Sequence, residues 1–473
     1  MAKKPIVFIP GYPASELIQK STGRVLFPPD PLDLIDEDKK RALVALLSDP
    51  GNQDIVAGEP IRNVLGIAKQ AQSLYDILRQ NRYGYTIHSG DNFRAVGWDW
   101  RKAVDDPGVQ AAVLGAIRQL RQANGGARVV VIAHSTGSLV LRRLLETQPE
   151  AVEGIERVLA FGATWAGNVF AIRSLVEGVS IGIWPAELAA GDVKKIVQST
   201  QAAYDLFPPD PAPGKTKLVG RDGKPLNLFV DATPPHAQLG PLVDLRWVPA
   251  GAAGDAIRQH AADADRRLGK RTIQIVAAGS APTPPITNVA GWGTSTDTSG
   301  VINGQGKITI EESKVGDGTS AFVSASWLDG PGVRNVFLPI GIYPTNGIPT
   351  VHSRIWDAPP VLEILDQVLL GHPLAPFVCA AADSDEAIDS RSDVTLRISA
   401  ADATGGALPD AQVLLCGVSP TPLAFSGHVR MDARLPRTAI RPDASRIFRF
   451  VAEVSWATPH GREAREVVVM FQT

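Results

Sequence analysis

The sequence has few cysteines, almost no net charge and no long apolar run. Cys379 and Cys416 are the only two cysteines among 473 residues, so no disulfide framework supports the main body of the chain. The two thiols, both near the C-terminus, either pair with each other or stay buried and reduced. The 47 Lys and Arg residues nearly balance the 49 Asp and Glu residues, for a net charge of −2. This balance lacks the basic signature of a protein that binds polyanions, so we expect no nucleic-acid partner.

The sequence also shows no pattern typical of a membrane-spanning helix or a signal peptide. No window comes near the roughly 18 consecutive apolar residues that a membrane-spanning helix needs. The apolar run behind the basic N-terminus covers residues 6–9 and stops at Pro10, which is too short for a signal peptide. The default expectation is therefore a cytoplasmic protein, with export by a route that needs no signal peptide left open.

The stretch from Arg128 to Val140 predicts a buried strand, a sharp turn and the start of a helix. Ser135 lies at the turn, in the local sequence Ala-His-Ser-Thr-Gly. A nucleophile elbow needs small residues two positions before and after its serine, because the strand and helix backbones crowd there. Ala133 stands where the first glycine of that motif usually is. The alternative is an ordinary turn in which Ser135 or Ser138 caps the helix.

Buried strands alternate with amphipathic helices around this turn. The periodicity predicts helices over 67–80, 109–122 and 362–370, and strands over 5–9, 91–98, 157–167, 272–280 and 333–340. Such alternation is typical of a mostly parallel sheet with helices on both faces, with functional groups at the carboxyl ends of the strands. With the elbow, it predicts an α/β-hydrolase fold over residues 1–373, with cap insertions at about 27–66 and 168–269.

A Gly/Pro loop, residues 10–13, follows the first predicted strand. In an α/β-hydrolase this loop supplies one backbone N–H of the oxyanion hole, and the residue after the serine supplies the other. Tyr12 and Thr136 are therefore the expected donors, unless the loop is a plain turn that ends the strand. We interpret Asp99-Trp100-Arg101 as an anchor that holds a loop by ion pairing and aromatic packing.

A serine hydroxyl becomes a good nucleophile only when an oriented base takes its proton. In α/β-hydrolases the partners follow in the order serine, acid, histidine, on loops after late strands. Asp317, between two glycines, and His352, before the last predicted helix, fit this order. His134 is next to the serine in sequence, but we expect its side chain to point elsewhere. The chemistry needs no metal or organic cofactor.

Residues 168–269 break the rhythm of strands and helices and predict a lid over the pocket. Ile183, Trp184 and Trp247 are candidate substrate contacts in it, and Trp165, beside the expected site, is a fourth. Exposed apolar side chains of this kind would suit a long acyl chain or a membrane surface. Alternatively, they pack the cap onto the body of the protein.

Several short motifs occur in chain order: Ile9-Pro10-Gly11 with Glu16-Leu17, Tyr83-Gly84-Tyr85, Asp99-Trp100-Arg101, Ala133-His134-Ser135-Thr136-Gly137, Gly162-Ala163-Thr164-Trp165-Ala166-Gly167, and Gly316-Asp317-Gly318-Thr319 before His352. Together they resemble the lecithin:cholesterol acyltransferase-like family of lipases and acyltransferases, over about residues 5–370. The resemblance implies Ser135 as nucleophile, with Asp317 and His352 as its partners. It also implies Tyr12 and Thr136 as oxyanion donors, and ester bonds of phospholipids or other lipids as substrates.

Two features depart from that family. Ser320-Ala321 follows the Gly-Asp-Gly-Thr motif where family members often have Val-Pro, and the chain lacks the cysteines of the cap disulfide that secreted members carry. We therefore expect a lid that is built differently.

The resulting functional hypothesis is a serine ester hydrolase or acyltransferase of the lipase or phospholipase type, acting through an acyl-enzyme on Ser135. The alternative is a non-enzymatic binding protein or scaffold that keeps the hydrolase fold while the C-terminal region engages a partner.

Residues 374–473 have a different texture, with short alternating strands. Apolar and polar residues alternate around Leu396, and 446–456 is expected to pair with 463–471. This pattern predicts a small β-sandwich of the immunoglobulin-like type. We expect it to dock a protein partner, a polymer or a sister subunit, or else to be a passive stabilising module.

Overall fold

The structure is a computed structural model. It describes residues 3–64, 68–69, 71–87, 91–183, 186–207, 218–219, 283–302, 308–313, 316–328, 332–340 and 351–371, together with the C-terminal strands whose bounds are given below. The predicted strand over 272–280 lies outside these residues.

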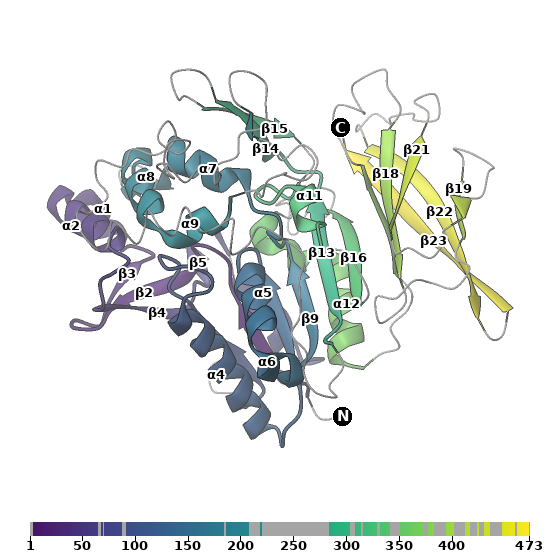
Figure 1. Cartoon of the computed structure of the whole chain (residues 1–473), viewed down its shortest axis with the longest axis horizontal. Coiled ribbons are helices and arrows are strands. Elements are labelled where there is room, and N and C mark those ends of the chain that lie inside the picture. The colour runs from purple at the N-terminus through teal and green to yellow at the C-terminus, as the bar shows by residue number, and fades with distance from the viewer. Residues whose placement is uncertain are drawn as a thin grey trace.

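A six-stranded parallel sheet forms the centre of the molecule (Figure 1). Its strands are β1 Ile6–Ile9, β7 Phe93–Ala95, β8 Val129–His134, β9 Ile155–Phe161, β13 Ile286–Trp292 and β16 Val333–Pro339. They lie in the order β16-β13-β9-β8-β1-β7, and every neighbouring pair is parallel. The predicted parallel α/β sheet is thereby confirmed, with the strand that leads to Ser135 near its middle.

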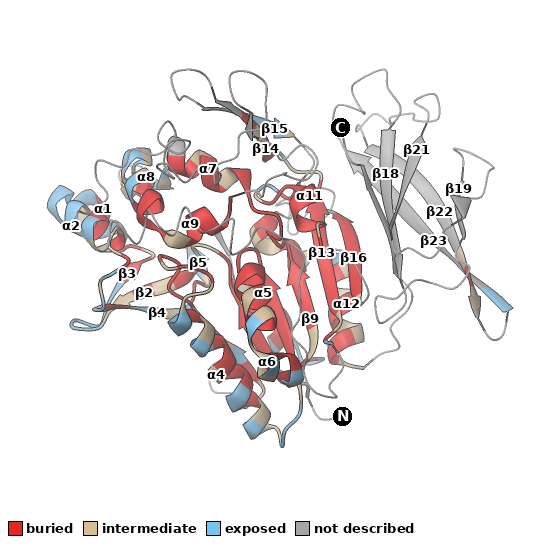
Figure 2. Cartoon of the chain, in the orientation of Figure 1, coloured by how far each residue is buried: buried red, intermediate tan, exposed pale blue. Residues whose placement is uncertain are grey.

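The sheet is buried on both faces, as strand β8 shows. Val129, Val131 and Ala133 belong to one hydrophobic cluster, whereas Val130 and Ile132 belong to another. Successive side chains of a strand point to opposite faces of the sheet. Strand β8 therefore contributes side chains to the hydrophobic cores on both faces. Figure 2 shows the buried residues along the sheet and on the helix faces that cover it.

Helices from both sides of the sheet supply the rest of these cores. One cluster includes residues of α4 Pro107–Ala123, α5 Gly137–Thr147 and α6 Pro149–Gly154, and the other includes residues of α3 Ala71–Arg79 and α12 Pro359–Leu369. The helices predicted over 67–80, 109–122 and 362–370 correspond to α3, α4 and α12. Helices on both faces are required by a sheet whose strands are mostly apolar and buried on both sides.

Strand β13 corrects the sequence analysis, because it is absent from the strands that the periodicity predicts. All seven of its residues are buried. The polar residue Asn288 in the middle of the strand hides its apolar pattern. The Asn288 side chain donates to Asn335 Oδ1 at 2.7 Å and accepts from the Trp165 indole at 3.0 Å. A buried amide with these partners is tolerated in a core strand, although it breaks the apolar run.

Two groups of elements lie beside the central sheet. The first, in the predicted insertion at 27–66 and just before it, is the antiparallel sheet β3-β2-β4 with two helices and a small hairpin: β2 Ser15–Gln19, β3 Arg24–Phe27, α1 Pro31–Ile35, α2 Glu37–Leu47, β4 Ile55–Pro60, β5 Asn63–Val64 and β6 Ala68–Lys69. The second, in the predicted cap, comprises α7 Val169–Val176, β10 Ile181–Ile183, β11 Ala186–Leu188, α8 Ala190–Ser199, α9 Gln201–Asp205 and β12 Leu218–Val219.

Further elements follow the cap. They are β14 Thr296–Ile302, β15 Ile308–Ser313, α11 Phe322–Ala325 and the 3₁₀ helix η3 His352–Asp357. Strands β14 and β15 pair antiparallel. Among the described helices, none is both long and apolar enough to cross a bilayer.

The described elements of the C-terminal region are all strands, as predicted from residue 374 onward: β17 Phe377–Ala382, β18 Val394–Ala401, β19 Gln412–Cys416, β20 Leu423–Ala424, β21 Arg430–Leu435, β22 Ile447–Thr458 and β23 Gly461–Gln472. They form the sheets β17-β18-β21 and β20-β19-β22-β23. The predicted pairing of 446–456 with 463–471 is confirmed by β22 and β23. The side chains of Cys379 and Cys416 lie outside the described part, so their pairing stays open.

Candidate active site

The turn at Ser135 has the strain of an elbow. Ser135 has a φ of 51°, and it is the one non-glycine residue with a positive φ among those the structure describes. An L-residue in this region costs about 1–3 kcal/mol and persists only where its surroundings enforce it. The helix that follows packs closely on the end of β1, because a Cβ at Gly137 would lie 2.5 Å from the Ile9 carbonyl oxygen. Ala133 is fully buried at the position of the usual first glycine, so a methyl group fits there.

Asp317 and His352 form a buried pair. The Nδ1 of His352 donates to Oδ2 of Asp317 at 2.7 Å, and the Asp317 side chain has no exposed surface. The other carboxylate oxygen accepts from the amides of Thr319 and Ser320, at 3.1 and 2.7 Å. The acid is therefore held on both oxygens, and it orients the imidazole ring.

The other ring nitrogen of His352 is open. Its Nε2 atom is buried and has no hydrogen-bond partner among the described residues. Because Nδ1 carries the hydrogen that binds the carboxylate, Nε2 of the neutral ring is a bare acceptor. This nitrogen can therefore accept a hydrogen bond from a group that comes next to it.

The serine and the Asp-His pair share one short piece of backbone at the end of β9. The Ser135 amide donates to the carbonyl of Phe161 at 3.0 Å. The next residue is Gly162, where a Cβ would lie 2.8 Å from both Asp317 Oδ2 and His352 Nδ1. The structure thus brings the three predicted residues around residues 161–162. No hydrogen bond joins the Ser135 hydroxyl to His352 Nε2. In enzymes without bound substrate, the hydrogen bonds between reacting side chains are often long and tighten only when the substrate binds.

The loop after β1 packs against the serine. A Cβ on Gly11 would lie 2.7 Å from the Cβ and 3.2 Å from the Oγ of Ser135, so only glycine allows this approach. The Trp98 indole donates to the Pro10 carbonyl at 2.9 Å and fixes the loop from the other side. Within the described part of the chain, the amides of Tyr12 and Thr136 donate to no protein acceptor. Both amides are therefore available to an oxyanion.

Asp99-Trp100-Arg101 is the structural anchor that the sequence predicts. Arg101 is fully buried and binds the Asp99 carboxylate with two nitrogens, at 2.9 and 2.7 Å. The Trp100 indole donates to the Ser15 carbonyl at 3.0 Å, and its ring packs edge-on against Tyr12. The motif thus supports the loop that approaches Ser135.

His134 has a role that sequence reasoning missed. Its ring centroid lies 4.7 Å from that of His352 and 4.8 Å from the Trp356 ring, and its Nε2 donates to the His352 carbonyl at 3.0 Å. Burial, and next the nearby His352 ring, lower the pKa of His134 to about 3. His134 is therefore a neutral support beneath His352. Its position beside the serine was the available signal.

The structure does not place the four candidate substrate contacts on the wall of a pocket. Trp165 has no exposed surface and lies in the hydrophobic core with its indole bonded to Asn288, which places it inside the protein instead of on an open wall. Ile183 lies on β10 by its backbone, and its side chain, Trp184 and Trp247 are outside the described residues. The described cap helices α8 and α9 bury apolar residues in the main core, as in the alternative of a cap packed onto the body.

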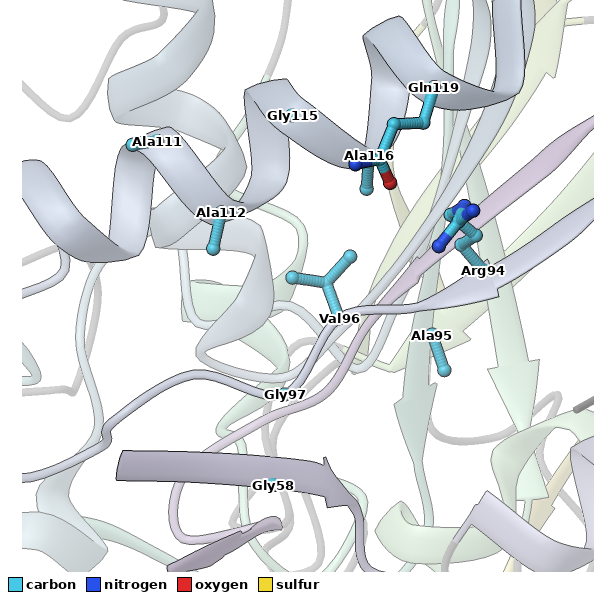
Figure 3. A pocket seen from close by; sticks show the side chains of 10 residues that line it. All are labelled: Gly58, Arg94, Ala95, Val96, Gly97, Ala111, Ala112, Gly115, Ala116 and Gln119. Carbon is cyan, nitrogen blue, oxygen red and sulfur yellow. The ribbon is translucent and has the colours of Figure 1, made fainter. Parts of the chain in front are cut away.

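Two other features of the described residues bear on ligands. A cavity of about 430 Å³ lies between α4 and the edge strand β7 (Figure 3), with Gly58, Arg94 and Gln119 in its lining. It shares no residue with the surroundings of Ser135, and most of its lining is glycine and alanine. In the same described part of the chain, no three His, Cys, Asp or Glu side chains come together as a metal site.

The fold and this site together define a class, the parallel α/β proteins that carry a serine at a strained turn after a central strand. Residues 64–225 match the model of the family Lecithin:cholesterol acyltransferase. The resemblance found in the sequence motifs is therefore confirmed over this range. The matched range contains Ser135 but neither Asp317 nor His352.

Similar curated proteins carry the name lysosomal phospholipase A and acyltransferase. The rat protein (Rattus norvegicus) is 33% identical over 99 residues, which are 20% of this chain and 23% of the rat protein. The human protein (Homo sapiens) matches with the same identity and coverage. The chain thus spans about a quarter of the length of these relatives.

Among solved structures, the Bacillus licheniformis lipase BlEst2 in its propeptide form covers 98% of this chain and 93% of its own, with a TM-score of 0.34 and 11% identity. A TM-score of this size carries no argument about fold or function.

Proposed function

We propose that the protein is a serine ester hydrolase or acyltransferase of the lipase or phospholipase type, with an α/β-hydrolase fold. One observation carries the proposal. A buried Asp317–His352 pair with an open Nε2 meets a strained serine around residues 161–162. What distinguishes this pair is that its open atom is a neutral imidazole nitrogen beside a strained serine, which is the arrangement of a base next to its nucleophile.

The proposed reaction begins when His352 Nε2 takes the proton of Ser135 Oγ, which attacks the carbonyl carbon of an ester. The oxygen of that carbonyl becomes negative and accepts hydrogen bonds from the Tyr12 and Thr136 amides. When the tetrahedral intermediate collapses, the ester's alcohol leaves with the proton from the imidazole. Water or a second alcohol then attacks the acyl-serine, and its proton passes through His352 back to Ser135.

Asp317 has a separate task in this scheme. Its carboxylate keeps the hydrogen of the imidazole on Nδ1 and stabilises the imidazolium that forms during each step. The amides of Thr319 and Ser320 hold the carboxylate in place, and the Ser320 hydroxyl donates to the Gly162 carbonyl at 3.1 Å. The departure from the family motif at Ser320 therefore adds a contact to the site.

Labelling with a fluorophosphonate probe tests the proposal, because the probe reacts with activated serines. We expect the native protein to be labelled and Ser135→Ala to be unlabelled. Ser138→Ala is the matched control and should still be labelled. The Ser138 hydroxyl already donates to the Ser135 carbonyl at 2.6 Å, so we do not expect it to react with the probe. If neither the native protein nor the control is labelled, the non-enzymatic scaffold is the better account.

A lipid substrate is the finer part of the proposal. The family match and the names of the relatives support an acyl ester of a lipid, with membrane contact through the cap as an accompanying proposal. We expect rates on p-nitrophenyl esters to rise with chain length and phospholipid vesicles to be hydrolysed. Activity confined to short soluble esters would rule out the lipid. We further propose that the C-terminal strands form an immunoglobulin-like domain that docks a partner.

A further inference from the structure

The Tyr12 side chain connects the oxyanion loop to the cap. The loop comes from the beginning of the chain and approaches Ser135 at Gly11. The phenol oxygen of Tyr12 lies 2.9 Å from Oγ1 of Thr200, which is the residue between α8 and α9. Residues 188 positions apart are therefore joined directly beside the proposed site.

The direction of this hydrogen bond is determined by its neighbour. The Thr200 hydroxyl donates its single hydrogen to the Val197 carbonyl at 2.7 Å. It must then accept from Tyr12, whose hydroxyl is the donor. Thr200 has no exposed surface, so water cannot readily replace either partner.

The cap end of this bond is firmly attached to the body. The Gln201 amide donates to the Arg101 carbonyl at 2.7 Å, and the buried Asp205 carboxylate accepts from the Val104 amide at 2.9 Å. Arg101 is in turn held by its ion pair with Asp99. The α8–α9 junction is thus a fixed point, and losing the Tyr12 bond would leave the cap attached.

The loop end is held less completely. Trp98 fixes the loop before Tyr12 through the Pro10 carbonyl, and Trp100 fixes it after Tyr12 through the Ser15 carbonyl. At Tyr12 itself, the hydrogen bonds of the described residues include only the side-chain bond to Thr200. The Ala14 amide closes the turn around Tyr12 by donating to the Gly11 carbonyl at 3.1 Å, and the Tyr12 ring packs on Trp100. The hydroxyl bond to Thr200 is therefore the tie that joins the turn to the cap.

We propose that the Tyr12 side chain is a positioning residue, through which the α8–α9 junction holds the Tyr12 amide toward the oxyanion. This inference rests on the proposed function, because it assigns how that same site is kept competent. It predicts that the hydroxyl affects the rate of the chemical step more than substrate binding, since the oxyanion forms only in that step.

The test compares three substitutions that each remove one polar group. Tyr12→Phe and Thr200→Val break the bond from opposite sides, and Tyr204→Phe removes a buried cap hydroxyl that bonds only within the cap, to the Gln198 carbonyl at 2.7 Å. We expect Tyr12→Phe and Thr200→Val each to lower kcat about 10-fold on p-nitrophenyl butyrate with little change in KM. Thr200→Ser, which restores the acceptor, should recover most of the rate, and Tyr204→Phe should keep kcat.

The double variant decides whether one bond is responsible. If Tyr12→Phe with Thr200→Val is no slower than either single variant, the two groups act through the same contact. Any of three results would overturn the inference. They are an equal loss of kcat in Tyr204→Phe, a double variant whose loss of kcat is the product of the two single losses, and an unchanged kcat in Tyr12→Phe.

Amide hydrogen exchange separates this inference from the proposed function, because it needs no activity. Thr200→Val should speed exchange in residues 10–15, whereas Tyr204→Phe should not. If Thr200→Val speeds exchange but the native protein is not labelled by a fluorophosphonate, the contact stands and the proposed function is contradicted. If Thr200→Val leaves exchange unchanged while the native protein is labelled, the inference alone is contradicted.

Discussion

Two buried aspartates, Asp99 and Asp317, each pair with a basic residue. The two pairs differ in whether every nitrogen of the basic side chain has a hydrogen-bond partner. Arg101 binds Asp99 through two nitrogens and the Asp49 carbonyl through the third, at 2.8 Å. His352 binds Asp317 through Nδ1 and leaves Nε2 without a partner among the described residues. The first pair is complete, and the second has one vacant position.

Under the proposed function, this difference separates a stabilising pair from a reactive one. Removing one member of a complete buried pair leaves an uncompensated charge, so the cost falls on stability. Removing the member with the open nitrogen takes away a proton acceptor, so the cost falls on the rate. The predictions below test this division, beginning with the largest expected effect.

His352→Gln should lower kcat on p-nitrophenyl butyrate by about 10⁴-fold, because glutamine cannot take the Ser135 proton. The thermal midpoint should change little, since the amide can still donate to Asp317. Steady-state kinetics together with thermal unfolding measures both quantities. A variant that retained a tenth of the native rate would show that another group is the base.

Arg101→Leu should show the opposite behaviour. Loss of one partner of a buried ion pair costs about 3–5 kcal/mol in the free energy of unfolding. Urea unfolding measures this loss, and Arg41→Gln is the control, because Arg41 and Asp38 form an exposed pair on α2. Equal stability of the two variants would refute the assigned difference between a buried and an exposed pair.

Gly162→Ala should affect the reactive pair without removing it. The added methyl group would lie 2.8 Å from Asp317 Oδ2 and His352 Nδ1 and displace the imidazole, and we expect kcat to fall about 10²-fold. Gly125→Ala controls for the backbone cost, since Gly125 also has a positive φ, of 63°, but has open space around it. If the two substitutions lowered kcat equally, crowding at the pair would not be the cause.

The pH dependence of stability tests the support beneath the pair. The pKa of His134 is lowered to about 3 in the folded protein, whereas that of an exposed histidine is about 6.5. Below pH 6.5 the unfolded chain therefore binds a proton that the folded protein excludes. The free energy of unfolding should fall as the pH drops from 6.5 toward 3, by about 1.4 kcal/mol per pH unit at most from this residue.

Urea unfolding at pH 7 and pH 5 measures this contribution in the native protein and in His134→Gln. The variant has no ring to protonate, and its amide can still donate to the His352 carbonyl. Its stability should therefore depend less on pH than that of the native protein. Identical pH dependence in the two proteins would mean that His134 is not held neutral.

The sequence predicted the features that local chemistry encodes. The parallel sheet follows from apolar strands alternating with amphipathic helices, and the elbow from small residues around Ser135. The order of serine, acid and histidine selected Asp317 and His352. Each of these signals lies within a few residues, or in chain order alone.

Features that depend on distant contacts escaped prediction. Strand β13 was missed because Asn288 interrupts its apolar run, and its partner Asn335 lies on the neighbouring strand β16. The contact of His134 with His352 and the bond between Tyr12 and Thr200 join segments far apart in the chain. No local pattern encodes such contacts, because they arise only when the sheet and the cap are assembled.

The structure of a covalent adduct tests the central claim most directly. After reaction with a fluorophosphonate, a crystal structure should show phosphorus bonded to Ser135 Oγ and the phosphonyl oxygen about 2.7–3.1 Å from the amides of Tyr12 and Thr136. The Nε2 atom of His352 should then face the adduct. Phosphorus on another residue, or a phosphonyl oxygen directed away from both amides, would contradict the account.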